Sequence, residues 1–125
     1  MKLTPKRRMM ATRVNIPSDF KQQIKHLKRK YPSVTAEVRE LVHQLQRGER
    51  PGDLVPDVGY EGVYKERLRN RSARRGKQGG FRLIYYEQYT ELVFLLLIYS
   101  KTEVDNIPAH EIRDVLERVT RGKSV

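Results

Sequence analysis

The chain has 125 residues and a formal net charge of +11 at pH 7, with 26 Lys and Arg against 15 Asp and Glu. It contains no cysteine, which excludes disulfides, cysteine-based zinc sites and thiol nucleophiles. The basic balance favours a polyanionic partner such as nucleic acid, an acidic protein or an anionic membrane surface, and no apolar run reaches the roughly 18–20 residues of a membrane span.

The N-terminal third predicts a basic tail, a short strand and two helices. Residues 1–10 are basic but lack the apolar stretch of a secretory signal, so we interpret them as a tail and expect a cytoplasmic protein. Residues 11–16 are rich in β-branched side chains, as in a strand. Helical spacing follows over 18–31 and 33–47, separated by Pro32. The apolar stripes are Phe20, Ile24, Leu27 and Tyr31 in the first helix, and Val34, Val38, Leu41, Val42 and Leu45 in the second.

The second half of the chain predicts a loop and then three strands. Residues 48–62 are rich in Gly and Pro, which is typical of a loop. Residues 63–70 alternate between two faces, and 81–88 form the next strand. The run 91–100 is almost entirely apolar, which indicates a strand buried on both faces. Only a couple of residues separate the last two strands, so they should form an antiparallel hairpin.

A closing helix is indicated by Ile112, Val115, Leu116 and Val119. Asp105 or Asn106 can cap it, and Pro108 suits its first turn. The predicted order is β-α-α-β-β-β-α, an α+β domain over residues 11–121 in which helices cover an antiparallel sheet. Residues 122–125 form a C-terminal tail.

The sequence gives no support for a metal or nucleotide cofactor. His26, His43 and His110 all fall in predicted helices, and none belongs to a pair with metal-ligand spacing. No glycine-rich nucleotide-binding motif is present. We therefore expect no cofactor.

The most informative feature is a set of cations that should converge on one face of the sheet. Its members are Lys65, Arg67 and Arg69 on one strand, Arg74, Arg75 and Lys77 on the following loop, Arg82 inside the next strand, and Lys101 after the last. Neighbouring strands lie roughly 5 Å apart, and no Asp or Glu occurs between Glu66 and Glu87. An anion would relieve the repulsion, and Gly76, Gly79 and Gly80 would let the backbone approach a phosphate. A solvated basic face is the alternative.

Two functions suit such a face. One is plain phosphate binding, which needs only charge. The other is RNA cleavage without metal, in which the ribose 2′-OH attacks the adjacent phosphate. That reaction needs a base, an acid for the leaving 5′-oxygen, and cations against the charge that develops on phosphorus. Clustered cations lower the pKa of a lysine, which suits it as a base, whereas arginine clamps phosphate bidentately.

Three segments carry a family resemblance: GDLVPDVGYEGVYKERLRN, GKQGGFRLIYY and LLLIYSKTEVDNI. Together, from about Gly52 to Ile107, they resemble the RelE/ParE superfamily of bacterial toxins, closest to its RelE- and HigB-like ribosome-dependent mRNA endonucleases. The resemblance implies the RelE-like microbial RNase fold and the toxin of a type II toxin–antitoxin pair, neutralised by a small acidic antitoxin. It also implies metal-independent cleavage of mRNA in the ribosomal A site, contacts with 16S rRNA and inhibition of translation.

The resemblance also implies roles for individual residues. Lys65 and Arg67 match the basic pair that supplies the general base and phosphate contacts, and Arg82 matches a transition-state clamp. Lys101 falls where the family carries a basic residue for the leaving group. Tyr99 could stack on a base or orient the phosphate, and the remaining cations of the set would bind RNA. The catalytic tyrosine that RelE-type members carry near the position of Ile107 is absent, which leaves the division of acid and base roles open.

Two other functions remain open at the level of sequence. A ParE-like inhibitor of DNA gyrase is a non-enzymatic binder on the same fold, although such members generally lack the complete basic set. The second alternative is a basic nucleic-acid-binding protein without activity. For the free protein we expect a monomer that does not act at membranes.

Overall fold

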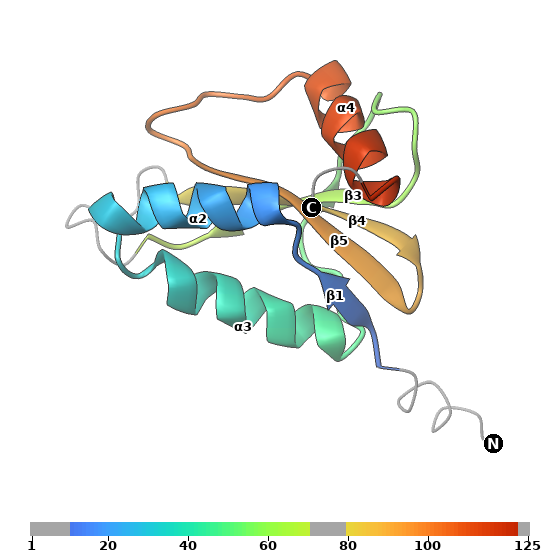
Figure 1. Ribbon diagram of the computed structural model, residues 1–125, viewed down its shortest axis with the longest axis horizontal. Helices are drawn as coiled ribbons and strands as arrows, with labels where there is room; N and C mark the ends of the chain where they lie inside the picture. The colour runs from blue at the N-terminus through green and yellow to red at the C-terminus, as the bar shows by residue number, and fades with distance from the viewer. Residues whose placement is uncertain (1–10, 71–79, 123–125) are drawn as a thin grey trace.

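The computed structural model describes residues 11–70 and 80–122 and forms one mixed sheet with helices on both faces (Figure 1). Its elements are β1 (Arg13–Asn15), α2 (Ser18–Lys30), α3 (Val34–Gln46), β2 (Asp53–Leu54), β3 (Val63–Leu68), β4 (Phe81–Tyr89), β5 (Leu92–Ser100) and α4 (Ala109–Thr120). The predicted α+β class is confirmed, and the three helices occur where the periodicity placed them. Among the described residues, no helix is both long and apolar enough to cross a membrane.

The sheet has the strand order β1-β5-β4-β3-β2. Strands β3, β4 and β5 form the expected antiparallel meander. Strand β1, however, runs parallel to β5, with Val14 opposite Val93, so the prediction of an entirely antiparallel sheet was wrong. The direction of β1 is set by pairing with a strand almost 80 residues away, which local periodicity does not encode.

The predicted loop 48–62 contains a short strand, β2, which adds a fifth strand to the sheet. Asp53 lies opposite Lys65, and Leu54 lies opposite Tyr64. Gly52 permits this approach, because its φ is +102° and a Cβ atom there would lie 2.5 Å from the carbonyl oxygen of Lys65. The high Gly and Pro content indicated a loop, but one of these glycines, Gly52, is needed for the close pairing of β2 with β3.

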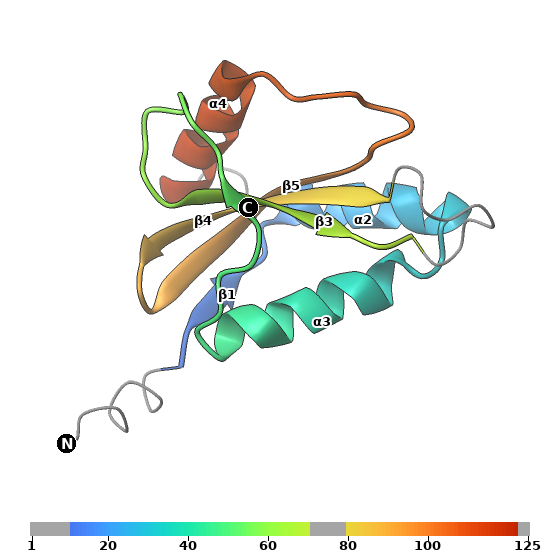
Figure 2. The same cartoon turned by 180° about the vertical axis from the view of Figure 1, so that it is seen from behind.

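The sheet is buried on both sides, with one hydrophobic cluster on each. The α2–α3 face presents Leu68, Phe81, Leu83, Tyr85, Val93, Leu95 and Ile98. The α4 face presents Val63, Ile84, Tyr86, Phe94, Leu96 and Tyr99. Figures 1 and 2 show α3 and α4 on opposite sides of the strands. The expectation that the run 91–100 is buried on both faces is confirmed.

A β-bulge in β5 decides which side chains share a face. The pairing passes from Tyr85 opposite Leu95 to Ile84 opposite Leu97, so Leu96 is an extra residue on β5. One extra residue reverses the alternation of every side chain that follows. As a result Tyr99 joins the α4 face, where it lies opposite Arg82.

The start of α4 differs from the prediction. Neither Asp105 nor Asn106 caps this helix; Pro108 is the N-cap residue, with φ −63° and ψ 148°, and no side chain caps it. The carboxylate of Asp105 instead accepts a hydrogen bond from Lys101 Nζ at 3.1 Å. Asp105 therefore belongs to the turn after β5 rather than to the helix.

The guanidinium of Arg50 joins three separate segments at the hairpin end of the sheet: the start of β1, the end of α3 and the β4–β5 hairpin. Its side chain is only 12% exposed and pairs through Nε with Glu87 Oε2 at 3.2 Å. Its remaining nitrogens donate to Leu45 O at 3.1 Å, Glu49 O at 2.8 Å, Thr12 Oγ1 at 3.1 Å and Thr90 O at 2.9 Å. Arginine offers five donors in a rigid planar fork, which a lysine cannot reproduce.

We expect Arg50→Ala to lower the free energy of unfolding by about 3 kcal/mol, because it leaves a partly buried carboxylate and several carbonyls without their donor. Urea denaturation of the purified protein measures this. The matched control is Arg47→Ala, which removes an exposed pair with Glu49 and should change the same quantity by less than about 0.5 kcal/mol. Equal effects of the two substitutions would contradict the role given to Arg50.

Candidate nucleic-acid interface

The strand cations predicted from sequence lie on the α4 face, at the end of the sheet away from the β4–β5 hairpin. Lys65 and Arg67 alternate along β3 with side chains that point to the α2–α3 face. Helix α4 packs nearer the hairpin, and residues 101–108 arch over the opposite end (Figures 1 and 2). Arg69 follows β3 and is exposed. The cations therefore gather beside the arch rather than beneath the helix.

Arg67, Arg82 and Tyr99 form a row across three adjacent strands. Arg67 lies directly opposite Arg82, and Arg82 lies directly opposite Tyr99. Like charges at directly opposed positions of a sheet repel each other. Burial lowers the pKa of the Arg82 guanidinium, and the neighbouring charge of Arg67 lowers it further. An anion placed between the two guanidinium groups would remove this repulsion.

Three of the strand cations have no ion-pair partner among the described residues. Within 11–70 and 80–122, none of the ion pairs involves Lys65, Arg67 or Arg69. The nearest carboxyl in sequence, Glu66, belongs to the opposite face of β3, and burial raises its pKa. Asp53 lies opposite Lys65 on β2, although no ion pair between described residues joins the two side chains. The charge of Arg67 is thus available to a ligand, and a phosphate would compete with Asp53 for Lys65.

Tyr99 ends the row with a hydroxyl that stays protonated at neutral pH. Burial raises the pKa of Tyr99; Arg82 opposes that shift, and Asp105 adds to it. The residue is only 7% exposed, so its ring offers little surface for stacking on a base. Of the two roles considered for Tyr99, orienting a phosphate through the hydroxyl fits this burial better.

Lys101 stands at the same end of the sheet but is engaged within its own turn. Its backbone N–H donates to Gly80 O at 3.0 Å, which extends the pairing of β4 and β5. Its Nζ donates to the backbone oxygen of Asp105 at 2.6 Å and to its carboxylate at 3.1 Å. Because Asp105 is 98% exposed, this pair is weak, and a phosphate can compete for the lysine. Asp105 was not predicted to belong to the site, although Lys101 and Asp105 carry opposite charges four residues apart in the sequence.

Gly80 has a structural role that differs from the one expected. Its φ is +70°, and a Cβ atom there would lie 2.6 Å from Leu68 O, so the glycine allows β3 and β4 to approach closely. The residue is buried at the start of β4. The other loop positions assigned to the interface, Arg74, Arg75, Gly76, Lys77 and Gly79, lie outside the described residues.

The histidines take no part in this site. His26, His43 and His110 are exposed on α2, α3 and α4 respectively. In the described part of the chain, no group of three or more His, Cys, Asp or Glu side chains could hold a metal ion.

The chain was also compared with known proteins. No family model matches it, and no curated protein matches it.

We expect Arg67→Gln to weaken binding of a single-stranded RNA oligonucleotide and to reduce the salt dependence of that binding. Loss of one phosphate contact should lower the slope of log K against log salt by about 0.7–1. Fluorescence anisotropy over a salt series measures the slope. Arg39→Gln, at an exposed position on α3, removes the same charge elsewhere and should leave it unchanged. A slope reduced equally by both substitutions would show nonspecific attraction only.

Gly80→Ala should be markedly more destabilising than Gly48→Ala. Both glycines have positive φ, +70° and +96°, but only a Cβ at Gly80 would meet another strand. We expect a loss in free energy of unfolding of about 1 kcal/mol at Gly48, from backbone strain, and of more than about 2 kcal/mol at Gly80. Denaturant titration of both variants checks the difference. Similar losses would mean that β3 and β4 do not require the close approach.

Proposed function

We propose that the protein is the toxin of a type II toxin–antitoxin pair, an endoribonuclease that cleaves mRNA in the ribosomal A site without a metal ion. The observation that carries the proposal is the direct opposition of Arg67 and Arg82 on adjacent strands. Two arginines at directly opposed positions repel each other, whereas one phosphodiester can accept hydrogen bonds from both.

In the proposed reaction the 2′-oxygen of a ribose attacks the adjacent phosphorus. The new P–O2′ bond forms as the P–O5′ bond breaks, which leaves a 2′,3′-cyclic phosphate and a 5′-hydroxyl. Lys65, on the same face of β3 as Arg67, removes the 2′-OH proton, and Lys101 supplies a proton to the leaving 5′-oxygen. Arg67 and Arg82 stabilise the charge that develops on the phosphoryl oxygens.

Tyr99 has a supporting role in this scheme. It lies next to Arg82 in the row, and its protonated hydroxyl can donate a hydrogen bond to a phosphoryl oxygen. Release of Lys101 from Asp105 would accompany RNA binding, because the phosphate replaces the carboxylate as the acceptor of its hydrogen bonds. The exposed cation Arg69 extends the positive surface along the RNA backbone.

The sequence resemblance supports the same proposal. The segments that resemble RelE- and HigB-like toxins include β3, the start of β4 and the end of β5, and these strands carry the cations and Tyr99. The RelE-like microbial RNase fold, a cytoplasmic location and contacts with 16S rRNA belong to the proposal as well. Its natural antagonist would be an acidic antitoxin, for which a partner of charge +11 is electrostatically suited.

The proposal predicts A-site cleavage of mRNA programmed on 70S ribosomes in the presence of EDTA, mapped by primer extension. Arg82→Ala should reduce the cleavage rate by a factor of about 10²–10³, as expected for loss of a group that stabilises transition-state charge. Arg39→Gln serves as the matched control and should cleave at the wild-type rate.

Other outcomes of this experiment are equally informative. Intact mRNA with the wild-type protein would contradict the nuclease, and a gyrase supercoiling assay would then separate a ParE-like inhibitor from an inactive basic binder. If Lys65→Ala cleaved at the full rate while Arg82→Ala did not, the general base would have to be another group.

A further inference from the structure

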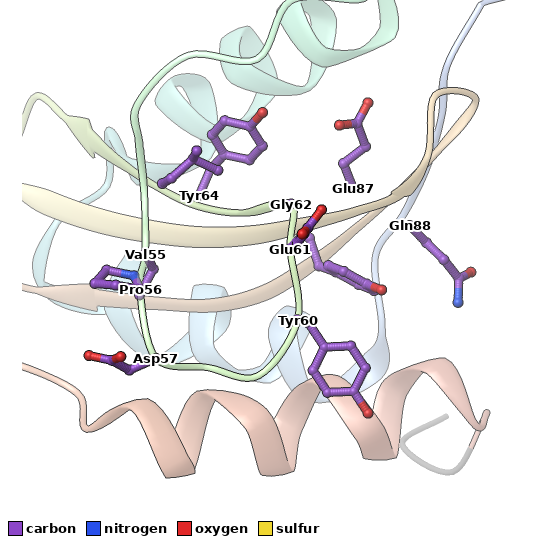
Figure 3. Close-up of a pocket in the computed structure, with 11 residues that line it drawn as sticks. Val55, Pro56, Asp57, Tyr60, Glu61, Gly62, Tyr64, Glu87 and Gln88 are labelled. Atoms are coloured by element: carbon purple, nitrogen blue, oxygen red, sulfur yellow. The ribbon is translucent and has the colours of Figure 1, made fainter.

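A groove lies at the hairpin end of the sheet, away from the cations. Its volume is about 940 Å³. Figure 3 shows its lining residues on the loop 55–62 and on the adjoining parts of β3 and β4. Its walls include three tyrosines and three carboxylates: Tyr60, Tyr64, Tyr86, Asp57, Glu61 and Glu87. Among the described residues that line it there is no Lys or Arg. In a chain of net charge +11, this is a locally acidic, aromatic groove.

The tyrosine walls are held in place by contacts behind them. Tyr60 donates its hydroxyl to Glu117 Oε2 at 2.7 Å and packs edge-on against Tyr86, with 5.9 Å between ring centroids. Tyr64 stacks on the buried Tyr85 at 5.1 Å. The groove is therefore preformed, and aromatic faces beside carboxylates suit the head group and stem of Arg or Lys.

Two of the carboxylates remain available to a cation. Glu87 already pairs with Arg50. Asp57 and Glu61 are exposed, and neither belongs to an ion pair between residues of the described ranges. The groove thus offers two exposed carboxylates and aromatic walls, which fits a basic, partly apolar extended segment.

The N-terminal segment of this chain has that composition and begins beside the groove. Residues 1–10, MKLTPKRRMM, carry four cations, no acid and several apolar side chains. The guanidinium of Arg50 donates hydrogen bonds to both Thr12 and Glu87. The start of the described chain therefore lies close to Glu87, a carboxylate that lines the groove. Ten residues can extend over about 33 Å, more than enough to cross it.

We propose that this groove is the docking site of the chain's own N-terminal segment, with cations from Lys6, Arg7 and Arg8 on Asp57 and Glu61. The docked segment holds its charge at the hairpin end of the molecule, away from the row of Arg67 and Arg82. The inference does not depend on the nuclease activity, since it concerns a different site and a different readout.

Because the protein has no cysteine, Lys2→Cys gives a unique position for a nitroxide spin label on the full-length chain. Paramagnetic broadening should weaken the amide signals of Glu61, Gly62 and Gln88 more than that of Lys28 on α2. The double variant Asp57→Asn/Glu61→Gln should remove that contrast; asparagine tolerates the positive φ of 63° at position 57. The charge-matched control Glu40→Gln/Glu111→Gln, at exposed helix positions, should preserve it.

Trypsin digestion under native conditions gives a second readout on the same proteins. Cleavage after Lys6, Arg7 and Arg8 should be about fivefold faster in Asp57→Asn/Glu61→Gln than in the control, as expected for loss of two rim ion pairs. Absence of selective broadening, or equal behaviour of the two double variants, would overturn the proposal. Broadening transmitted from a spin-labelled copy to an isotope-labelled one would also overturn it, because the occupant would then be a second molecule.

Discussion

The guanidinium of Arg50 is the constraint on which the arrangement of the sheet depends. It connects the beginning of β1, the carboxyl end of α3, and the β4–β5 hairpin through bonds to Thr12, Leu45, Thr90 and Glu87. Strand β1 has only three residues, so its pairing with β5 alone would hold it weakly. With the hairpin fixed at this end, the register of β4 and β5 carries through to the other end, where the cations meet.

The sequence predicted those parts of the fold that follow from local periodicity. Helices α2, α3 and α4 have strong apolar stripes at helical spacing, and Pro32 separates the first two. Strands β3 to β5 were recognisable from alternation, β-branched content and a short connection. Features that depend on residues far apart in the sequence were not predictable in this way. The parallel direction of β1 depends on its pairing with β5, and the formation of β2 depends on the close approach of Gly52 to the backbone of β3.

The same division applies to the candidate site. Period-two alternation was enough to place Lys65 and Arg67 on one face of β3. The direct opposition of Arg67 and Arg82 required the register between strands, which sequence spacing leaves undetermined. The contact of Lys101 with Asp105 arises in an irregular turn, where no periodicity operates. The role of Gly80 likewise depends on how closely β3 and β4 approach each other.

The bulge at Leu96 has a consequence for tracing this site through evolution. Upstream of Leu96, even-numbered residues of β5 face α4, whereas downstream of it the odd-numbered Tyr99 does. A relative that lacked this one residue could retain every other side chain of β5 and still turn its equivalent tyrosine toward α2 and α3. In a sequence alignment, the position of a gap within an apolar run is usually treated as unimportant. Here a single gap in β5 would distinguish sheets that can form the row of Arg67, Arg82 and Tyr99 from sheets that cannot.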